Sequence, residues 1–322
     1  MEGVKTVKKN ILFLWILFTT FLSCTYAEEY SIFRKDGLYG IIDEDRAVVM
    51  EPIYDWISIN SNSIVCSKDR TKEIYNKSLE LLFYGSGVKL TYFNENQIMI
   101  KESVSVKTWL LDVETGDLTV YELKKNYSEE NGYRENVGLV WRENNGGYSY
   151  SIVDVEGNVL LTDIEDAHSC YTNGMIAVIL KDGKSGFVNT KGEMVIAADF
   201  YIEPSDEGLR KEPIIRYLFN EDYALVKNLE QKWVQYNIKG EKKSLPKNIK
   251  PVEYSYKNGL VPVMDIETKK YGYMNPDFDM VIPCEFSYAE PFDGKYAIVE
   301  KDGKDAVIDT KGNIYYCDEF SK

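Results

Sequence analysis

Histidine is almost absent from this chain of 322 residues, in which His168 is the single example. Imidazole-based catalysis and histidine metal sites therefore have little to build on. The five cysteines show no Cys-x-x-Cys spacing, which excludes a zinc knuckle and a thioredoxin-type motif. Basic side chains are outnumbered, since 38 Lys and Arg face 52 Asp and Glu and the formal net charge is −14. A chain this acidic lacks the basic patch of a nucleic-acid-binding protein, so no nucleic-acid partner is expected.

Sequence motifs of catalysis and cofactor binding are missing as well. No phosphate-binding loop, Gly-x-Ser-x-Gly or His-Glu-x-x-His occurs. His168 lies two residues from Cys170, but no third residue that would orient a nucleophilic pair can be identified. We interpret the two as a loop histidine beside a structural cysteine. The sequence thus predicts no catalytic residue, no metal site and no cofactor, and it predicts that Cys66 and Cys284, in strand-like runs, are buried.

A long hydrophobic run occurs only near the start of the chain. Three lysines precede the uncharged run Ile11–Leu22. This run is too short to span a bilayer and has the length of the apolar region of a secretory signal. Residues 1–24 are therefore predicted to be a signal peptide, and residues 25–322 to form the mature repeat domain. We expect the protein to be exported to the periplasm or the cell surface.

Two cleavage sites fit this signal. The sequence Phe21-Leu22-Ser23-Cys24 resembles a bacterial lipobox, in which the cysteine becomes acylated. We favour this site because Cys24 follows the hydrophobic run directly, and a lipid anchor would explain it. Cleavage after Ala27 is the alternative. A lipid on Cys24 would be the only contact with the membrane that we expect.

Between residues 30 and 316 the sequence is a repeat. Each unit contains a short apolar strand, a turn, a second strand that ends in Asp or Asn, and a third strand. We call the residue that ends the second strand the anchor. The anchors lie on average about 38 residues apart, and each follows an apolar or aromatic residue: Asp43, Asn76, Asp112, Asp154, Asn189, Asn237, Asn275 and Asp309. Self-similarity at such a period is typical of repeat folds.

The spacing around the anchor has a physical cause. An Asp or Asn at the first position of a turn accepts hydrogen bonds from the backbone, and a glycine further on supplies a positive φ. Gly stands three residues after the anchor in four units, and one residue later than that in the third unit: Gly157, Gly192, Gly240, Gly312 and Gly116. Lys-Asp-Gly occurs eight residues before the anchor at 35–37, 181–183 and 301–303. Each unit is therefore predicted to contain tight β-hairpin turns, with a bulge after the anchor.

These units resemble the WG (or KWG) repeat family of bacterial proteins. Tyr39-Gly40 and Tyr271-Gly272 open the two best copies, while Gly186 and Trp233 belong to partial copies. No copy contains a literal Trp-Gly pair. The resemblance covers almost all of the mature chain and implies no catalytic residue. We interpret Tyr39, Tyr271 and Trp233, which stand at the aromatic position of the repeat, as packing residues.

The predicted fold class is all-β, because no segment after the signal shows helical spacing of apolar residues. A single unit of this size cannot bury its own apolar face, so the units must stack. A β-propeller is favoured because ring closure removes exposed strand edges, and an open β-solenoid of stacked hairpins is the alternative. Residues 201–222 and 241–257 have few apolar runs and are expected to be insertions in loops.

Three functions are compatible with this pattern. We favour a non-catalytic repeat scaffold of the cell envelope that mediates protein–protein interaction, with an envelope or extracellular protein as partner. A carbohydrate or cell-wall binding module, which would hold a glycan on surface aromatics, is the alternative. A propeller-type enzyme would require Asp, Glu and Tyr to converge at one end of the axis, because fold alone does not determine function. The sequence leaves the partner, the disulfide pairing and the oligomeric state open.

Overall fold

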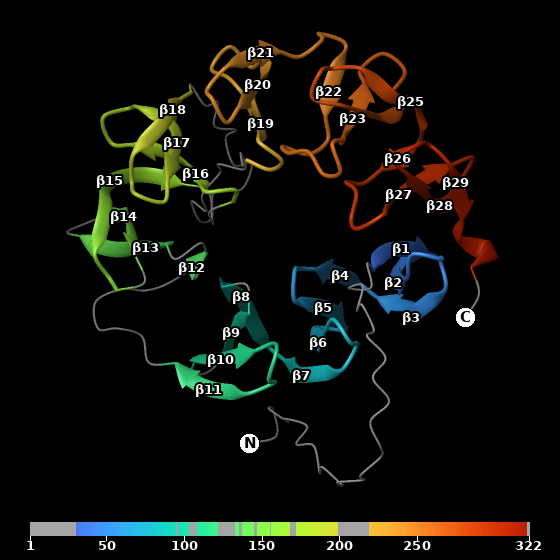
Figure 1. Ribbon diagram of the computed structural model, residues 1–322, viewed down its shortest axis with the longest axis horizontal. Coiled ribbons are helices and arrows are strands. Elements are labelled where there is room, and N and C mark those ends of the chain that lie inside the picture. Colours follow the sequence, from blue (N-terminus) through green and yellow to red (C-terminus); the bar gives the residue numbers. More distant parts are fainter. Residues whose placement is uncertain are drawn as a thin grey trace, which may run out of the picture.

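The computed structural model describes residues 30–94, 96–102, 108–121, 133–134, 137–144, 147–154, 156–167, 172–198 and 219–320. These residues form short antiparallel strands and one 3-10 turn, η1 (Cys317–Glu319). The strands build seven sheets that follow one another around a ring (Figure 1). The fold is therefore a seven-bladed β-propeller, which confirms the favoured prediction over the open solenoid. The predicted signal peptide with Cys24, and the pair His168 and Cys170, lie outside the described residues.

Three or four strands make up most blades. The first three sheets are β1 (Ser31–Lys35), β2 (Leu38–Ile42) and β3 (Val48–Tyr54); β4 (Trp56–Ile59), β5 (Ser63–Lys68), β6 (Thr71–Asn76) and β7 (Leu81–Ser86); and β8 (Val88–Asn94), β9 (Gln97–Glu102), β10 (Thr108–Asp112) and β11 (Leu118–Tyr121). The last three are β19 (Tyr223–Lys227), β20 (Trp233–Asn237) and β21 (Lys242–Ser244); β22 (Ile249–Pro251), β23 (Val261–Asp265), β24 (Tyr271–Met274) and β25 (Met280–Phe286); and β26 (Tyr288–Ala289), β27 (Tyr296–Lys301), β28 (Lys304–Asp309) and β29 (Ile314–Tyr316).

The fourth sheet is larger and contains two repeat units. Its strands are β12 (Tyr133–Arg134), β13 (Val137–Asn144), β14 (Gly147–Asp154), β15 (Val159–Ala167), β16 (Met175–Leu180), β17 (Ser185–Asn189) and β18 (Met194–Ala197). The first half of β15 pairs with β14 and the second half with β16. At other boundaries a single residue, such as Asp55 or Gly87, separates the last strand of one unit from the first strand of the next. The eight predicted units therefore occupy seven sheets, because β15 is shared.

Six of the anchors are the last residue of a strand, and Asp43 and Asn275 directly follow one. All eight accept backbone hydrogen bonds within the turn that follows. Asp43 Oδ1, for example, accepts the N–H groups of Asp45 and Ala47 at 2.9 Å each. The other seven anchors each accept at least one such bond from their own turn: Asn76, Asp112, Asp154, Asn189, Asn237, Asn275 and Asp309. Where glycine is missing three residues after the anchor, either a larger residue adopts the positive φ, as Arg46 (69°), Leu79 (59°) and Phe278 (74°) do, or Gly116 (75°) does so one residue later.

The glycine of the Tyr-Gly pair gives the neighbouring strand room to bulge. A Cβ added to Gly40 would lie 2.6 Å from the carbonyl oxygen of Met50, and one added to Gly272 would lie 2.5 Å from that of Ile282. The pairing register shifts at both places. In β20 the corresponding residue is Val234, and the pairing of β20 with β21 is regular. The glycine is therefore required where the carbonyl of the bulging strand comes this close, as it does beside Gly40 and Gly272.

Apolar side chains form clusters within blades and between neighbouring blades. Phe187 and Phe219, for example, pack edge to face with ring centroids 4.6 Å apart. Cys66 and Cys317 are buried, whereas Cys284 is only half-buried. Residues 241–257 were expected to be a loop insertion, which is wrong: they contain β21 and β22, whose short pairings leave little apolar pattern in the sequence. Within the described ranges, no helix is long and apolar enough to cross a membrane.

Candidate functional site

The ring closes where the first blade meets the last. Strand β1 lies beside β27 and β28, and the blue and red ends of the chain meet there in Figure 1. Among the described residues the first sheet contains only β1–β3 and the last only β26–β29, so no strand is shared across this boundary. Side chains therefore hold the closure together, and most of the long-range polar contacts between the chain ends gather there.

Arg34, at the end of β1, is the central residue of the closure. Its Nη2 and Nε lie 2.6 and 3.0 Å from Asp305 Oδ1, and Nη2 lies 3.7 Å from Glu300. Its guanidinium also covers the ring of Tyr288 at 4.7 Å. The side chains of Arg34 and Asp305 are 16% and 19% exposed, so water screens the pair only in part. Burial lowers the pKa of Arg34, but the hydrogen bond and charge of Asp305 outweigh it and raise the pKa above its ordinary value.

Sequence reasoning missed this pair, although one half of it left a signal. Asp305 lies four residues before the anchor Asp309, the position that Tyr39 and Tyr271 occupy in their units. An acid in the aromatic position of the last unit marks that unit as different. Nothing in the sequence points to Arg34 as its partner, because the two residues lie near opposite ends of the chain.

A second polar group lies next to Arg34. The hydroxyl of Tyr288 donates to Glu290 Oε1 at 2.7 Å, and that of Tyr39 donates to the same oxygen at 3.3 Å. Burial raises the pKa of both phenols, so they remain protonated and act as donors at neutral pH. Of the three residues predicted at the aromatic position, Tyr39 therefore joins the closure. Trp233 packs against Tyr254 instead, and Tyr271 packs on the core cluster between the last two blades.

The turn after the first anchor also reaches the last blade. Arg46 Nη1 donates to the hydroxyl of Tyr296 at 3.0 Å, and that hydroxyl donates to the carbonyl oxygen of Glu44 at 3.1 Å. Ser31 Oγ accepts the backbone N–H groups of Lys295 and Tyr296 at 3.0 and 3.3 Å. The closure is thus stabilised at both ends of its strands.

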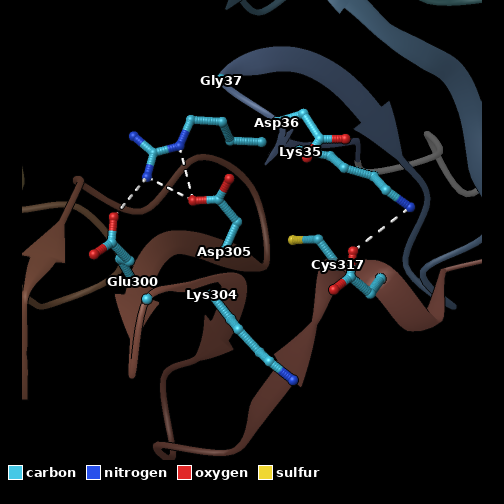
Figure 2. Close-up of a pocket in the computed structure, with 10 residues that line it drawn as sticks. Lys35, Asp36, Gly37, Glu300, Lys304, Asp305 and Cys317 are labelled. Atoms are coloured by element: carbon cyan, nitrogen blue, oxygen red, sulfur yellow. Dashed lines mark hydrogen bonds and ion pairs between the residues drawn. The ribbon is translucent and has the colours of Figure 1, made fainter.

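A cavity of about 470 Å³ opens between the two blades (Figure 2). The turn Lys35-Asp36-Gly37 forms one wall, and Gly303, Lys304 and Asp305 form the other, with Cys317 and Asp318 from η1 between them. Lys35 Nζ lies 3.8 Å from Asp318 Oδ1. We call this cavity the closure pocket. Its walls are charged, so it suits a polar ligand better than an apolar one.

The pocket contains one cysteine, Cys317. Burial raises the pKa of the Cys317 thiol to about 12. The thiol is therefore protonated at neutral pH and is not an activated nucleophile. Arg34 is engaged by Asp305 and Glu300 of the last blade, across the closure. In the part of the chain that the structure describes, no group of three or more His, Cys, Asp or Glu side chains is arranged to hold a metal ion.

One face of the ring carries the loops that precede the anchor strands, between the first and second strands of each unit. Among the described residues these loops are 36–37, 69–70, 181–184, 228–232, 266–270 and 302–303. Because successive propeller blades have the same orientation, these loops lie on one face, which we call the hairpin face. The closure pocket opens among them, whereas the anchor turns lie at the opposite ends of the blades. The anchors and the glycines that follow them therefore shape turns and do not line the pocket, whereas Gly37 and Gly303 of the predicted Lys-Asp-Gly turns do.

Comparisons with known proteins support the repeat and the fold. The model of the WG-containing repeat matches residues 39–65 and 271–304, and both segments begin at a Tyr-Gly pair. The resemblance inferred from the sequence is confirmed at these two sites. A comparison with curated proteins finds no match.

Several solved structures share the architecture. Apo AztD from Citrobacter koseri is similar with a TM-score of 0.53 and 12% identity, over 91% of this chain and 94% of that one. The β-propeller domain of the Trilobed protease from Pyrococcus furiosus has a TM-score of 0.45 and 13% identity, over 90% and 97% of the two chains. Hsv2p from Kluyveromyces lactis has a TM-score of 0.44 and 10% identity, over 78% and 92%. Identities this low concern the fold alone.

Proposed function

We propose that this WG-repeat propeller is a non-catalytic binding scaffold of the cell envelope, and that it binds a partner protein through the hairpin face. The observation that carries the proposal is the set of large apolar side chains exposed on that face. Leu229, in the loop 228–232, is 65% exposed, and Trp56, the first residue of β4, is 48% exposed. Trp56 pairs with Ser67 beside the loop 69–70, which places it at the same end of its blade.

Charged side chains surround these apolar residues. Lys72 Nζ lies 5.5 Å from the ring centroid of Trp56, and an exposed ion pair, Lys232 with Glu230, follows Leu229 in its loop. Protein interfaces commonly combine an exposed Trp and aliphatic anchors with a charged rim, and tryptophan is enriched among the residues that dominate binding energy. Leu38 directly follows the turn that lines the closure pocket and is exposed too. The part of the proposed interface that contains Leu38 is therefore next to the pocket.

The test is capture of an envelope protein by the purified chain 25–322. Saturable recovery of one protein, weakened at least tenfold by Trp56→Ala and by Leu229→Ser, supports the proposal. Val120→Ser is the matched control, because Val120 is equally exposed at 64% but lies on the outer strand β11. Recovery that Val120→Ser reduces as much as Leu229→Ser contradicts the assignment to the hairpin face.

Isolated sacculi serve as a parallel arm for the alternative function. An exposed tryptophan can also stack on a sugar ring. Retention on sacculi that Trp56→Ala abolishes and Leu229→Ser leaves intact would replace the protein-binding proposal with cell-wall binding.

The envelope location depends on the predicted signal. Expression of the full chain in a bacterial host with labelled fatty acid tests it directly. If residues 21–24 are a lipobox, the wild type should carry the labelled fatty acid and Cys24→Ser should not, and both proteins should be exported. Full-length, unlabelled protein in the cytoplasm would contradict the location.

A further inference from the structure

Two charged side chains in the walls of the closure pocket form no ion pair with another residue of the pocket. Arg34 is engaged by Asp305 and Glu300, and Lys35 lies near Asp318. Asp36, by contrast, makes no hydrogen bond or ion pair with any described residue, and Lys304 forms no ion pair with one. Both side chains are exposed. Asp36 belongs to the first blade and Lys304 to the last, so one free anion and one free cation stand on opposite walls.

The free lysine is specific to the closure. The turn 301–304 reads Lys-Asp-Gly-Lys, and the turn 181–184 in the fourth sheet has the same four residues. There, Lys184 Nζ lies 2.6 Å from Asp182 Oδ2 of its own turn. Lys304 is directed elsewhere: its Nζ lies 5.8 Å from the ring centroid of Tyr316, and the residue lines the pocket. Figure 2 shows Asp36 above Cys317 and the side chain of Lys304 running below it, away from Asp36, so that Lys304 must turn to face a ligand held by Asp36. The same local sequence is thus closed by an ion pair in one place and left without one beside a cavity in the other.

We propose that the closure pocket binds a small zwitterion, a molecule that carries one ammonium and one carboxylate group, such as a free amino acid or a short peptide. The ammonium pairs with Asp36 and the carboxylate with Lys304, and each contact is a charge-assisted hydrogen bond. The volume of about 470 Å³ is within the range of small-molecule sites.

The remaining charges of the pocket offset one another, because Arg34 pairs with Asp305 and Glu300, and Lys35 with Asp318. A plain anion that meets Lys304 would also face the free carboxylate of Asp36. A plain cation that meets Asp36 would also face the ammonium of Lys304. A ligand that carries both charges satisfies both walls at once, and like-charge contacts discriminate against the single ions.

Binding here has a consequence for the ring. Because the two walls come from the first and the last blade, a bound zwitterion bridges the closure without any strand being shared. A ligand that binds only the folded ring shifts the unfolding equilibrium by the factor 1 + [L]/Kd, about elevenfold at ten times Kd. This proposal does not rest on the partner-protein function, because that function is assigned to Trp56 and Leu229, which do not line the pocket.

The experiment is isothermal titration calorimetry of the chain 25–322, paired with thermal unfolding, with three zwitterions that differ in the separation of their charges: glycine, 4-aminobutyrate and glycylglycine. Acetate and methylamine are the single-charge probes. We expect saturable binding and a raised Tm with at least one zwitterion, and binding at least tenfold weaker with acetate and with methylamine. Asp36→Asn and Lys304→Gln should each weaken zwitterion binding at least tenfold.

Matched controls separate the pocket from the turn. Asp182→Asn and Lys184→Gln make the same changes in the Lys-Asp-Gly-Lys turn 181–184, away from the closure, and should leave binding unchanged. Asp36 adopts a positive φ of 53°, which asparagine tolerates equally, so Asp36→Asn keeps the turn intact. The proposal is overturned if none of the three zwitterions binds at concentrations up to about 50 mM. It is also overturned if acetate or methylamine binds as tightly, or if the pocket variants bind like the wild type.

Discussion

The guanidinium of Arg46 lies 4.1 Å above the ring centroid of Tyr315 and so joins the first blade to the last. Arg46 stands three residues after its anchor, where other units carry glycine. Those glycines also face the preceding blade: a Cβ added to Gly240 would lie 3.7 Å from Ile196, and one added to Gly312 would lie 3.9 Å from Ile282. At the closure, too, the residue three positions after the anchor faces the neighbouring blade. There it is an arginine that makes the contact through its side chain, where the other units have a glycine.

The side chain of Arg46 should stabilise the fold, whereas its positive φ should destabilise it. Arg46→Ala removes the contact with Tyr315 and the hydrogen bond to Tyr296, and should lower the free energy of unfolding by about 1–2 kcal/mol. Arg46→Gly removes the same contacts but relieves the positive φ of 69°, and should recover about 1 kcal/mol of that loss. Urea unfolding measures both. Equal stabilities of the two variants would contradict the backbone part.

The Arg34–Asp305 pair should matter more than an exposed ion pair. Arg34→Ala and Asp305→Asn each leave a partly buried charge without its partner, and each should cost about 2 kcal/mol. The double variant should cost less than the sum of the two, because both changes remove one interaction. Lys184→Gln breaks an equally short pair on the surface, and its effect should stay below about 0.5 kcal/mol. Additive losses in the double variant would show that the two residues act separately.

Glycines of the repeat should differ in their tolerance of alanine. In Gly272→Ala the new methyl group would lie 2.5 Å from the carbonyl oxygen of Ile282, so the backbone of β25 must move, at a cost of about 3 kcal/mol. In Gly312→Ala the methyl group has room, and only the positive φ of 89° opposes it, at about 1 kcal/mol. Chemical unfolding of both variants gives the comparison. The reverse order would refute the role assigned to the bulge.

Stability should decline at alkaline pH, in part through Tyr54. Burial raises the pKa of its phenol from about 10 to about 12. Because the pKa is higher in the folded chain, the contribution of Tyr54 is complete below pH 10 and is lost as the pH rises through 12. Burial also raises the pKa of the Cys66 and Cys317 thiols, from about 9 to about 12. Their contribution to stability therefore begins to decline at a lower pH, from about 9. Tyr54→Phe should therefore lose less stability than the wild type between pH 10 and 12, as followed by urea unfolding. If the free energies of unfolding of Tyr54→Phe and the wild type fell in parallel with pH, the raised pKa of Tyr54 would be contradicted.

Local chemistry explains why the anchor turns could be predicted from the sequence, whereas the side-chain contacts that close the ring could not. Asp43 and Asn189 bind backbone groups within four residues of themselves, so sequence spacing alone reveals their turns. Arg34 and Asp305 meet only because the ring closes, and a charge pair between chain ends has no periodic signal. The sharing of β15 was also hidden, since it depends on one residue, Asp163, that bends the strand at a φ of 59° without interrupting it.

The shared strand gives the ring unequal mechanical strength. Across β15, backbone hydrogen bonds run without a break from β12 to β18, so these two units resist shear as one piece. At the closure, within the described residues, only side-chain contacts oppose separation. A force applied to the two ends of the chain would therefore rupture the ring first between Arg34 and Asp305, and the last fragment to yield would be the sheet on the far side.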